Sequence, residues 1–170
     1  MSMKIVKTGT GKNARPTLPE STLILGVGNL LLCDEGVGIH VIRALDAGAA
    51  GSLPPRVRAL DGGTGGFHLV GEIQAHARVI FVDATLDDNP PGTVTVLEPR
   101  HASDFPPLLS AHEIGLRDMI EAMTLTGKIP RMHLITISAA NINEVGMKLT
   151  PPVAAAIPEV ISAIKTLLNE

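Results

Sequence analysis

The amino-acid sequence predicts a single three-layer αβα domain, an α/β fold in which helices cover both faces of a twisted, mostly parallel five-stranded sheet. Three observations lead to this fold class. Short apolar runs alternate with segments of helical periodicity along the chain. The chain has 170 residues, the usual length of one domain. It is 45% hydrophobic but only 18% charged, a composition that suits a compact core.

The first 20 residues are set apart from this domain. Residues 1–20 are basic and contain Gly, Thr, Asn and Pro, but they lack the apolar core of a signal peptide. We therefore expect a mobile leader at 1–20. Residues 21–170 form the domain, because no internal repeat or interdomain linker is evident in them.

Five short apolar segments predict the strands. Buried parallel strands have this profile because helices cover both of their faces. The first segment, TLIL, ends at Gly26, and the third, VIFV, is the most strongly apolar and is followed by Asp83. The predicted strands are residues 22–25, 57–60, 79–82, 93–97 and 134–138.

Four segments are predicted to be helices. Ser110 and Glu113 form a capping box at the start of the third. Thr150 and Pro151 have the form of an N-cap and first turn for the last, which Pro158 is predicted to kink. The predicted helices cover about residues 37–47, 67–77, 111–123 and 151–168, and Gly48 stops the first of them.

Composition and charge exclude several classes of partner. A net charge of -3 and an aromatic content of 2% give no basis for binding nucleic acid or an anionic membrane. No apolar run approaches the roughly 20 residues that span a bilayer. The single cysteine, Cys33, forms no internal disulfide, so we expect the protein in a reducing compartment, the cytoplasm.

Acidic residues follow the first three predicted strands. Glu35 lies just past the first strand, Asp61 after the second and Asp83 after the third, while His112 opens the helix after the fourth. Ligand sites of such sheets form beyond the carboxyl ends of the strands. We therefore predict that Glu35, Asp83 and His112 converge on a metal ion. Two carboxylates and an imidazole, neutral near a helix N-terminus, leave positions open on nickel, zinc or iron.

The same loop allows a nucleotide-binding interpretation. Gly26 and Gly28 could begin a dinucleotide fingerprint, but Leu31 stands where the third glycine should be, and Asp61 lies too far along the chain for the ribose. A tight turn that lets a helix pack on a strand explains the glycines better.

Other interpretations stay open for the remaining polar residues. Asp34 and Glu35 could be solvated acids that complement a helix dipole, and Asp83 could cap a turn. Cys33 could be a thiol nucleophile, although no histidine base is evident beside it in the sequence. The histidines without ligand spacing are expected at the surface or in packing, and they are His40, His68, His76, His101 and His133.

Taken together, the motifs resemble one family. The loop GVGNLLLCDEGVG, then LDGGTGG, VDAT and SAHEIGL, follow one another as they do in the maturation endopeptidases of [NiFe] hydrogenases. The resemblance extends from Thr22 to Leu168. It departs at Gly65, where the family more often has alanine, and it supports no role for Cys33.

The resemblance implies an α/β peptidase domain at 21–170. It also implies an endopeptidase that removes a short C-terminal peptide from the hydrogenase large-subunit precursor after nickel insertion. Its metal ligands would be Glu35, Asp83 and His112. Nickel would come with the precursor, although another divalent metal could bind in vitro, and no further cofactor is expected.

The catalytic step is left open between two chemistries. The metal could polarise the scissile carbonyl or a water, or Asp61 could act as the base. We expect a monomer that binds the nickel-loaded precursor. The alternatives are a noncatalytic nickel-dependent binding module or nickel chaperone and, third, a nucleotide-binding α/β domain.

Overall fold

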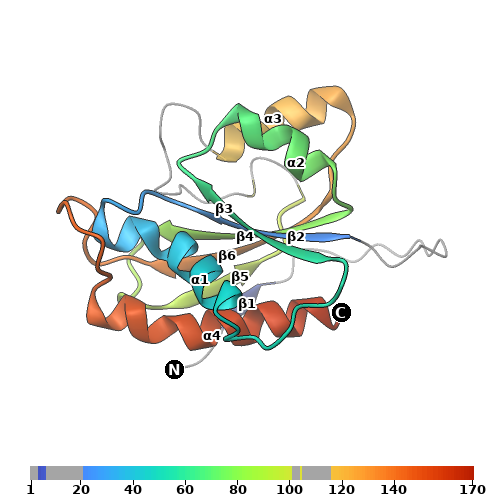
Figure 1. Ribbon diagram of the computed structural model, residues 1–170. Helices are drawn as coiled ribbons and strands as arrows, with labels where there is room; N and C mark the ends of the chain where they lie inside the picture. The colour runs from blue at the N-terminus through green and yellow to red at the C-terminus, as the bar shows by residue number, and fades with distance from the viewer. Residues whose placement is uncertain (1–3, 7–20, 101–103, 105–115) are drawn as a thin grey trace.

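The fold is built on a six-stranded sheet with the order β1-β5-β6-β4-β2-β3. The computed structural model describes residues 4–6, 21–100, 104 and 116–170 (Figure 1). Strands β2, β3, β4 and β6 are parallel to their neighbours in this group, and β5 runs antiparallel to β6. The strands are Lys4–Val6 (β1), Thr22–Val27 (β2), Val57–Gly63 (β3), Arg78–Thr85 (β4), Val94–Leu97 (β5) and Arg131–Ser138 (β6).

The predicted α/β class and mostly parallel sheet are confirmed, with the five predicted strands present as β2 to β6 and β1 added as a sixth. The sixth strand, β1, lies within the segment 1–20 that was expected to be a mobile leader, and it pairs in parallel with β5. This pairing has a physical reason, because β5 would otherwise be an edge strand with unpaired backbone groups. The domain boundary between residues 20 and 21 stays a prediction.

Helices cover both faces of the sheet, as predicted. Helices α1 and α4 lie on one face, and α2 and α3 lie on the other (Figure 1). The predicted start of the third helix, with Ser110 and Glu113, lies outside the described residues, and that helix extends to Thr126 rather than ending at Met123. The helices are Val37–Asp46 (α1), Val70–Gln74 (α2), Leu116–Thr126 (α3) and Pro151–Leu168 (α4), with 3-10 turns at Cys33–Gly36 (η1) and Phe67–Leu69 (η2).

Strand β4 runs through the hydrophobic core, and all eight of its residues are buried. Its side chains alternate between the two faces. Ile80 and Val82 pack into the cluster beneath α1 and α4, whereas Val79 and Phe81 belong to the cluster beneath α2 and α3. This alternation fixes the direction of every side chain that follows on the strand.

Strands β3 and β4 are longer than predicted. Asp61 and Asp83 therefore lie within strands and not just beyond them. The extension of β4 follows from its neighbour β6, which continues the ladder by pairing Asp83 with Thr136 and Thr85 with Ser138. The two acids keep their place near the carboxyl edge of the sheet.

Helix α4 is the one helix in the described part of the chain with the length and apolar composition to cross a membrane, at 18 residues and a mean hydropathy of 1.3. Its packing accounts for that composition. Val153, Val160 and Ile164 are fully buried in the core cluster that α4 shares with the sheet. The helix starts at Pro151, as predicted, and continues through Pro158, whose predicted kink stays a prediction.

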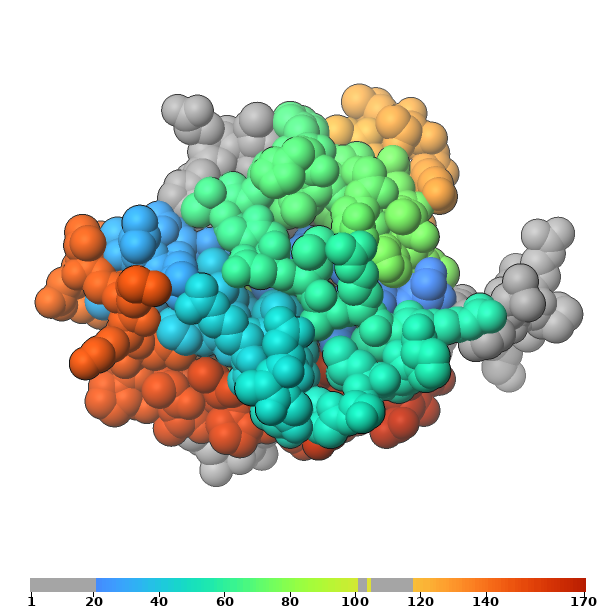
Figure 2. Space-filling model, viewed as in Figure 1, coloured from blue at the N-terminus to red at the C-terminus, as the bar shows by residue number. Residues whose placement is uncertain are grey.

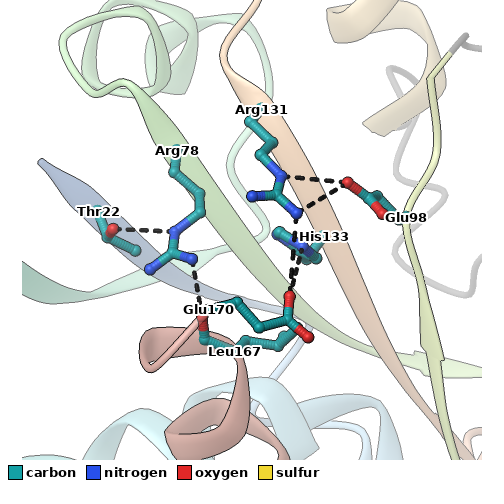
Figure 3. A network of polar contacts seen from close by, with 7 residues as sticks. All are labelled: Thr22, Arg78, Glu98, Arg131, His133, Leu167 and Glu170. Atoms are coloured by element: carbon teal, nitrogen blue, oxygen red, sulfur yellow. Dashed lines mark hydrogen bonds and ion pairs between the residues drawn. The ribbon is translucent and has the colours of Figure 1, made fainter. Parts of the chain in front are cut away.

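A polar network ties the end of α4 to the amino ends of the strands (Figure 3). Buried Arg78 donates to Thr22 Oγ1 at 3.1 Å and to the carbonyl oxygen of Leu167 at 2.7 Å. Arg131 on β6 forms an ion pair with Glu98 at 3.1 Å. These contacts hold the end of the sheet opposite to the acidic residues.

His133 lies inside this network with only 2% of its surface exposed, which confirms its expected role in packing. Within the described ranges, neither ring nitrogen has a hydrogen-bond partner, and the carboxylate of Glu170 is 4.0 Å from Nε2. Burial lowers the pKa of His133, and the neighbouring charge of Arg131 lowers it further. The imidazole is therefore neutral in the folded protein at neutral pH.

We predict that His133 makes the fold sensitive to acid. Below the ordinary histidine pKa of 6.5, the unfolded chain binds a proton that folded His133 resists, so the free energy of unfolding falls. The loss from this group is at most about 1.4 kcal/mol per pH unit. Urea denaturation of the wild type and of His133→Leu at pH 7.5 and 5.5 measures it, and His133→Leu should lose less stability.

The matched control is His40→Gln. Burial also lowers the pKa of His40, so this variant measures how much of the acid sensitivity comes from that second histidine. Equal losses of stability on acidification in the wild type and in His133→Leu would contradict the role assigned to His133.

Candidate functional site

Glycines allow close backbone contacts in the loop from β2 to α1. Gly28 has a φ of +139°, and a Cβ there would lie 1.9 Å from the carbonyl oxygen of Glu35. A Cβ on Gly26 would lie 2.3 Å from the carbonyl oxygen of Gly38, at the start of α1. Both contacts are closer than any side chain allows, so they confirm the tight-turn interpretation of these glycines.

The loop follows β2, at the point where the connections of the sheet change direction. The chain passes from β2 through α1 to β3 on one side, then through α2 to β4 on the other side of β2. A topological switch point therefore lies between the carboxyl ends of β2 and β4, which is where open α/β sheets bind ligands. Glu35 lies in the turn that follows β2, and Asp83 lies near the carboxyl end of β4.

Glu35 is held in the 3-10 turn η1 at this point. Its surface is 4% exposed, so the alternative of a solvated acid is wrong. Its backbone N–H donates to the carbonyl oxygen of Leu32 at 3.0 Å, and η1 packs against β4. A carboxylate buried between two elements at the switch point is a candidate ligand for a cation.

Asp83 is fully buried on the neighbouring strand. One of its carboxylate oxygens accepts a hydrogen bond of 2.7 Å from the backbone N–H of Ala84. By the alternation along β4, Asp83 lies on the same face as Val79 and Phe81, the face that α2 and α3 cover. It therefore faces the side of the sheet where α3 begins.

The third predicted ligand, His112, lies outside the described residues. It precedes α3 by four residues in the chain, since α3 begins at Leu116. Among the residues that the structure does describe, no three His, Cys, Asp or Glu side chains are grouped so that they could hold a metal ion. His112 is not among those residues, so the predicted set of Glu35, Asp83 and His112 stays a prediction.

Asp61 differs from these acids in both exposure and direction. It is exposed on the edge strand β3, where it pairs in register with Gly26. The alternation along β3 places it on the face of Val57 and Ala59, opposite to that of Asp83. Its carboxylate accepts a hydrogen bond of 2.9 Å from the N–H of Gly63, so it also stabilises the turn that follows.

Asp34 has a role that the sequence did not indicate. Its carboxylate has no exposed surface, so its interpretation as a solvated acid is wrong. It accepts four hydrogen bonds of 2.7–3.0 Å, from the backbone N–H groups of Ala140, Asn141 and Thr150 and from the hydroxyl of Thr150. Asp34 therefore joins η1 to the segment between β6 and α4.

Thr150 explains part of this arrangement. The residue stands at the N-cap position of α4, as predicted, but its side chain makes no capping hydrogen bond to that helix. Its hydroxyl donates instead to Asp34 at 2.8 Å. No local pattern could have revealed this contact, since the two residues are 116 positions apart.

Cys33 is buried, with a φ of +44°. Burial raises the pKa of its thiol, and the carboxylates of Glu144 and Asp34 add to the rise. Thiolate formation is therefore disfavoured, which argues against the alternative of a cysteine nucleophile.

Comparisons with known proteins agree on one family. A family model described as hydrogenase maturation protease (HycI) matches residues 39–167. The hydrogenase 2 maturation protease of Escherichia coli (strain K12) is 34% identical over 150 residues, which span 87% of this chain and 90% of that protein.

Solved structures agree with these matches. The hydrogenase maturating endopeptidase HybD from E. coli superposes with a TM-score of 0.78 at 33% identity, covering 87% of this chain and 91% of the other. The [NiFe] hydrogenase maturation protease HybD from Thermococcus kodakarensis has a TM-score of 0.70 at 28% identity, covering 86% and 98%. The α/β fold is the same in both.

We predict that Asp34 is the most costly of these acids to remove. Asp34→Ala removes the charged acceptor of three part-buried backbone N–H groups, and a hydrogen bond to a charged group is worth about 1.5–3 kcal/mol. The free energy of unfolding, measured by urea denaturation, should fall by about 3 kcal/mol or more. Thr150→Val is the matched control, because it removes only the hydroxyl donor and should cost about 1 kcal/mol. Equal costs for the two variants would refute the anchoring role of Asp34.

Proposed function

This chain belongs to the hydrogenase maturation protease family, and on that premise we propose that it removes the C-terminal extension of a [NiFe] hydrogenase large-subunit precursor after nickel has been inserted. Members of the family are endopeptidases, so the chain is a hydrolase of peptide bonds. Membership favours the enzyme over a noncatalytic nickel-binding module or chaperone and over a nucleotide-binding domain.

One observation carries the proposal for the site. Two carboxylates, Glu35 and Asp83, are buried at the topological switch point on elements that pack against each other. Burying two acids is costly unless positive charge compensates them. The nickel ion of the precursor would supply such a charge, so a precursor that carries nickel would bind beside the two acids more favourably than one that lacks it. The enzyme would in this way sense whether nickel has been loaded.

His112 completes the proposed set of ligands. Helix α3, which follows it in sequence, covers the face on which Asp83 lies. Carboxylate and imidazole donors suit nickel, and three ligands from the enzyme leave positions for groups of the precursor. Another divalent metal could take the same donors in vitro.

Hydrolysis requires that a water oxygen attack the scissile carbonyl carbon, that the C–N bond break and that the leaving amine gain a proton. Coordination of the carbonyl oxygen by nickel would stabilise the developing negative charge. We propose that Asp61 takes the proton from the attacking water. Because Asp61 and Asp83 lie on opposite faces with β2 between them, the peptide would then cross the end of β2.

The proposed partner and compartment follow from the same features. A single copy carries all four proposed residues, so we propose that it acts as a monomer. The one cysteine is free and buried, which suits a reducing cytoplasm, where the nickel-loaded precursor would be the only macromolecule it binds.

We predict that His112→Ala abolishes processing. The variant lacks one of three ligands to the nickel of the precursor, so peptide release should fall below detection by mass spectrometry. His68→Ala is the control, because His68 is an exposed histidine on η2 and its loss should leave processing unchanged. Processing by His112→Ala at the wild-type rate would remove His112 from the site.

We further predict that Asp61→Asn separates the two catalytic chemistries. The amide oxygen still accepts the hydrogen bond of Gly63, so the turn is retained. If Asp61 is the base, kcat for release of the peptide falls about 10²-fold or more while KM changes little. A kcat close to that of the wild type would assign activation of the water to the nickel alone.

A further inference from the structure

Large hydrophobic side chains are exposed mainly at one end of the molecule. In the part of the chain that the structure describes, five of the seven lie in segments that follow the carboxyl ends of β2, β3, β4 and β6, the edge that holds the candidate site. These five are Leu31, Phe67, Leu86, Val145 and Met147. The other two, Leu125 and Ile129, lie at the end of α3 and before β6, toward the opposite edge.

Three of the five are held on two paired loops. The N–H of Gly146 donates to the carbonyl oxygen of Leu31 at 2.9 Å, and the N–H of Cys33 donates to the carbonyl oxygen of Gly146 at 2.7 Å. Val145 and Met147 flank Gly146 and are 82% and 52% exposed, while Leu31 is 58% exposed. We call these three residues, Leu31, Val145 and Met147, the apolar ridge.

The apolar ridge is anchored before any partner binds. The four hydrogen bonds to Asp34 fix both ends of the segment from 140 to 150. His40 on α1 makes a further hydrogen bond of 3.1 Å to the carbonyl oxygen of Met147. Figure 2 shows this segment, in orange, standing out beside the blue loop that follows β2. A surface that is already ordered loses little conformational entropy on binding.

A cavity of about 510 Å³ lies along the ridge. Cys33, Glu144, Val145, Met147 and Leu149 contribute to its wall. Its wall therefore includes the turn η1, in which Cys33 is two positions before Glu35. The turn η1 thus contributes one residue to the cavity and another to the candidate site.

We propose that the apolar ridge docks an apolar segment of the hydrogenase precursor beside the peptide bond to be cut, an inference that rests on the proposed function for the identity of the partner. An enzyme that cuts one protein at one bond needs binding energy from parts of the substrate that do not react. Burial of the exposed apolar side chains of the ridge against the precursor supplies it. A second copy of the chain fits less well, because it would occupy the edge of the sheet that also holds the candidate site.

The test introduces the same charge at two positions that are both largely exposed, Val145 at 82% and Leu125 at 90%. Val145→Asp places a carboxylate on the ridge, and Leu125→Asp places one on a residue that is 90% exposed at the far edge. Nickel-loaded precursor is the probe, and release of the peptide is followed by mass spectrometry. Val145→Asp should raise KM about tenfold with kcat unchanged, and Leu125→Asp should change neither. Thermal melting verifies that both variants fold.

The outcomes separate this inference from the proposed function. Equal KM values for Val145→Asp and Leu125→Asp, with normal cleavage by the wild type, overturn the docking role and leave the proposed function intact. If the wild type does not cut the precursor, the proposed function fails. In that case, titration calorimetry with the same precursor tests the docking role of the ridge. Weaker binding of the precursor by Val145→Asp than by Leu125→Asp supports that role, and equal binding overturns it. A wild-type dimer that Val145→Asp dissociates also overturns it.

Discussion

The carboxylate of Asp34 is the contact on which the arrangement of the site depends. It joins three parts of the chain, the turn after β2, the segment after β6 and the start of α4, through four part-buried hydrogen bonds. A buried anion with four donors is stable, but the same anion with donors removed is costly. The turn that carries Glu35 therefore has one favourable position on the sheet.

Two further constraints act in the same direction. Gly26 and Gly28 allow the loop and α1 to lie closer to β2 than side chains would permit. The fully buried strand β4 holds Asp83 in a ladder that β6 continues to Thr85. Both candidate ligands that the structure describes thus stand on backbone that packing and hydrogen bonds restrain, as a site that discriminates between ions requires.

Much of the fold could be predicted from apolar periodicity, because helices and buried strands leave distinct patterns. The ends of β3 and β4 were missed because Asp, Gly and Thr end them, and neighbouring strands rather than local preference extend the ladder there. Strand β1 was missed because three residues carry no periodicity. At the site, Glu35 and Asp83 could be named from their places after strands. The role of Asp34 could not, because its partners lie 106 to 116 positions away.

Three of the four donors to Asp34 are main-chain amides, which every amino acid except proline provides. These hydrogen bonds to Asp34 therefore place almost no demand on the identity of the residues that donate them. Substitutions at the exposed positions Val145 and Met147 can accumulate without loosening the connection to η1. Under the proposed docking role of the apolar ridge, such substitutions would change which precursor is accepted while the reaction centre stays unaltered.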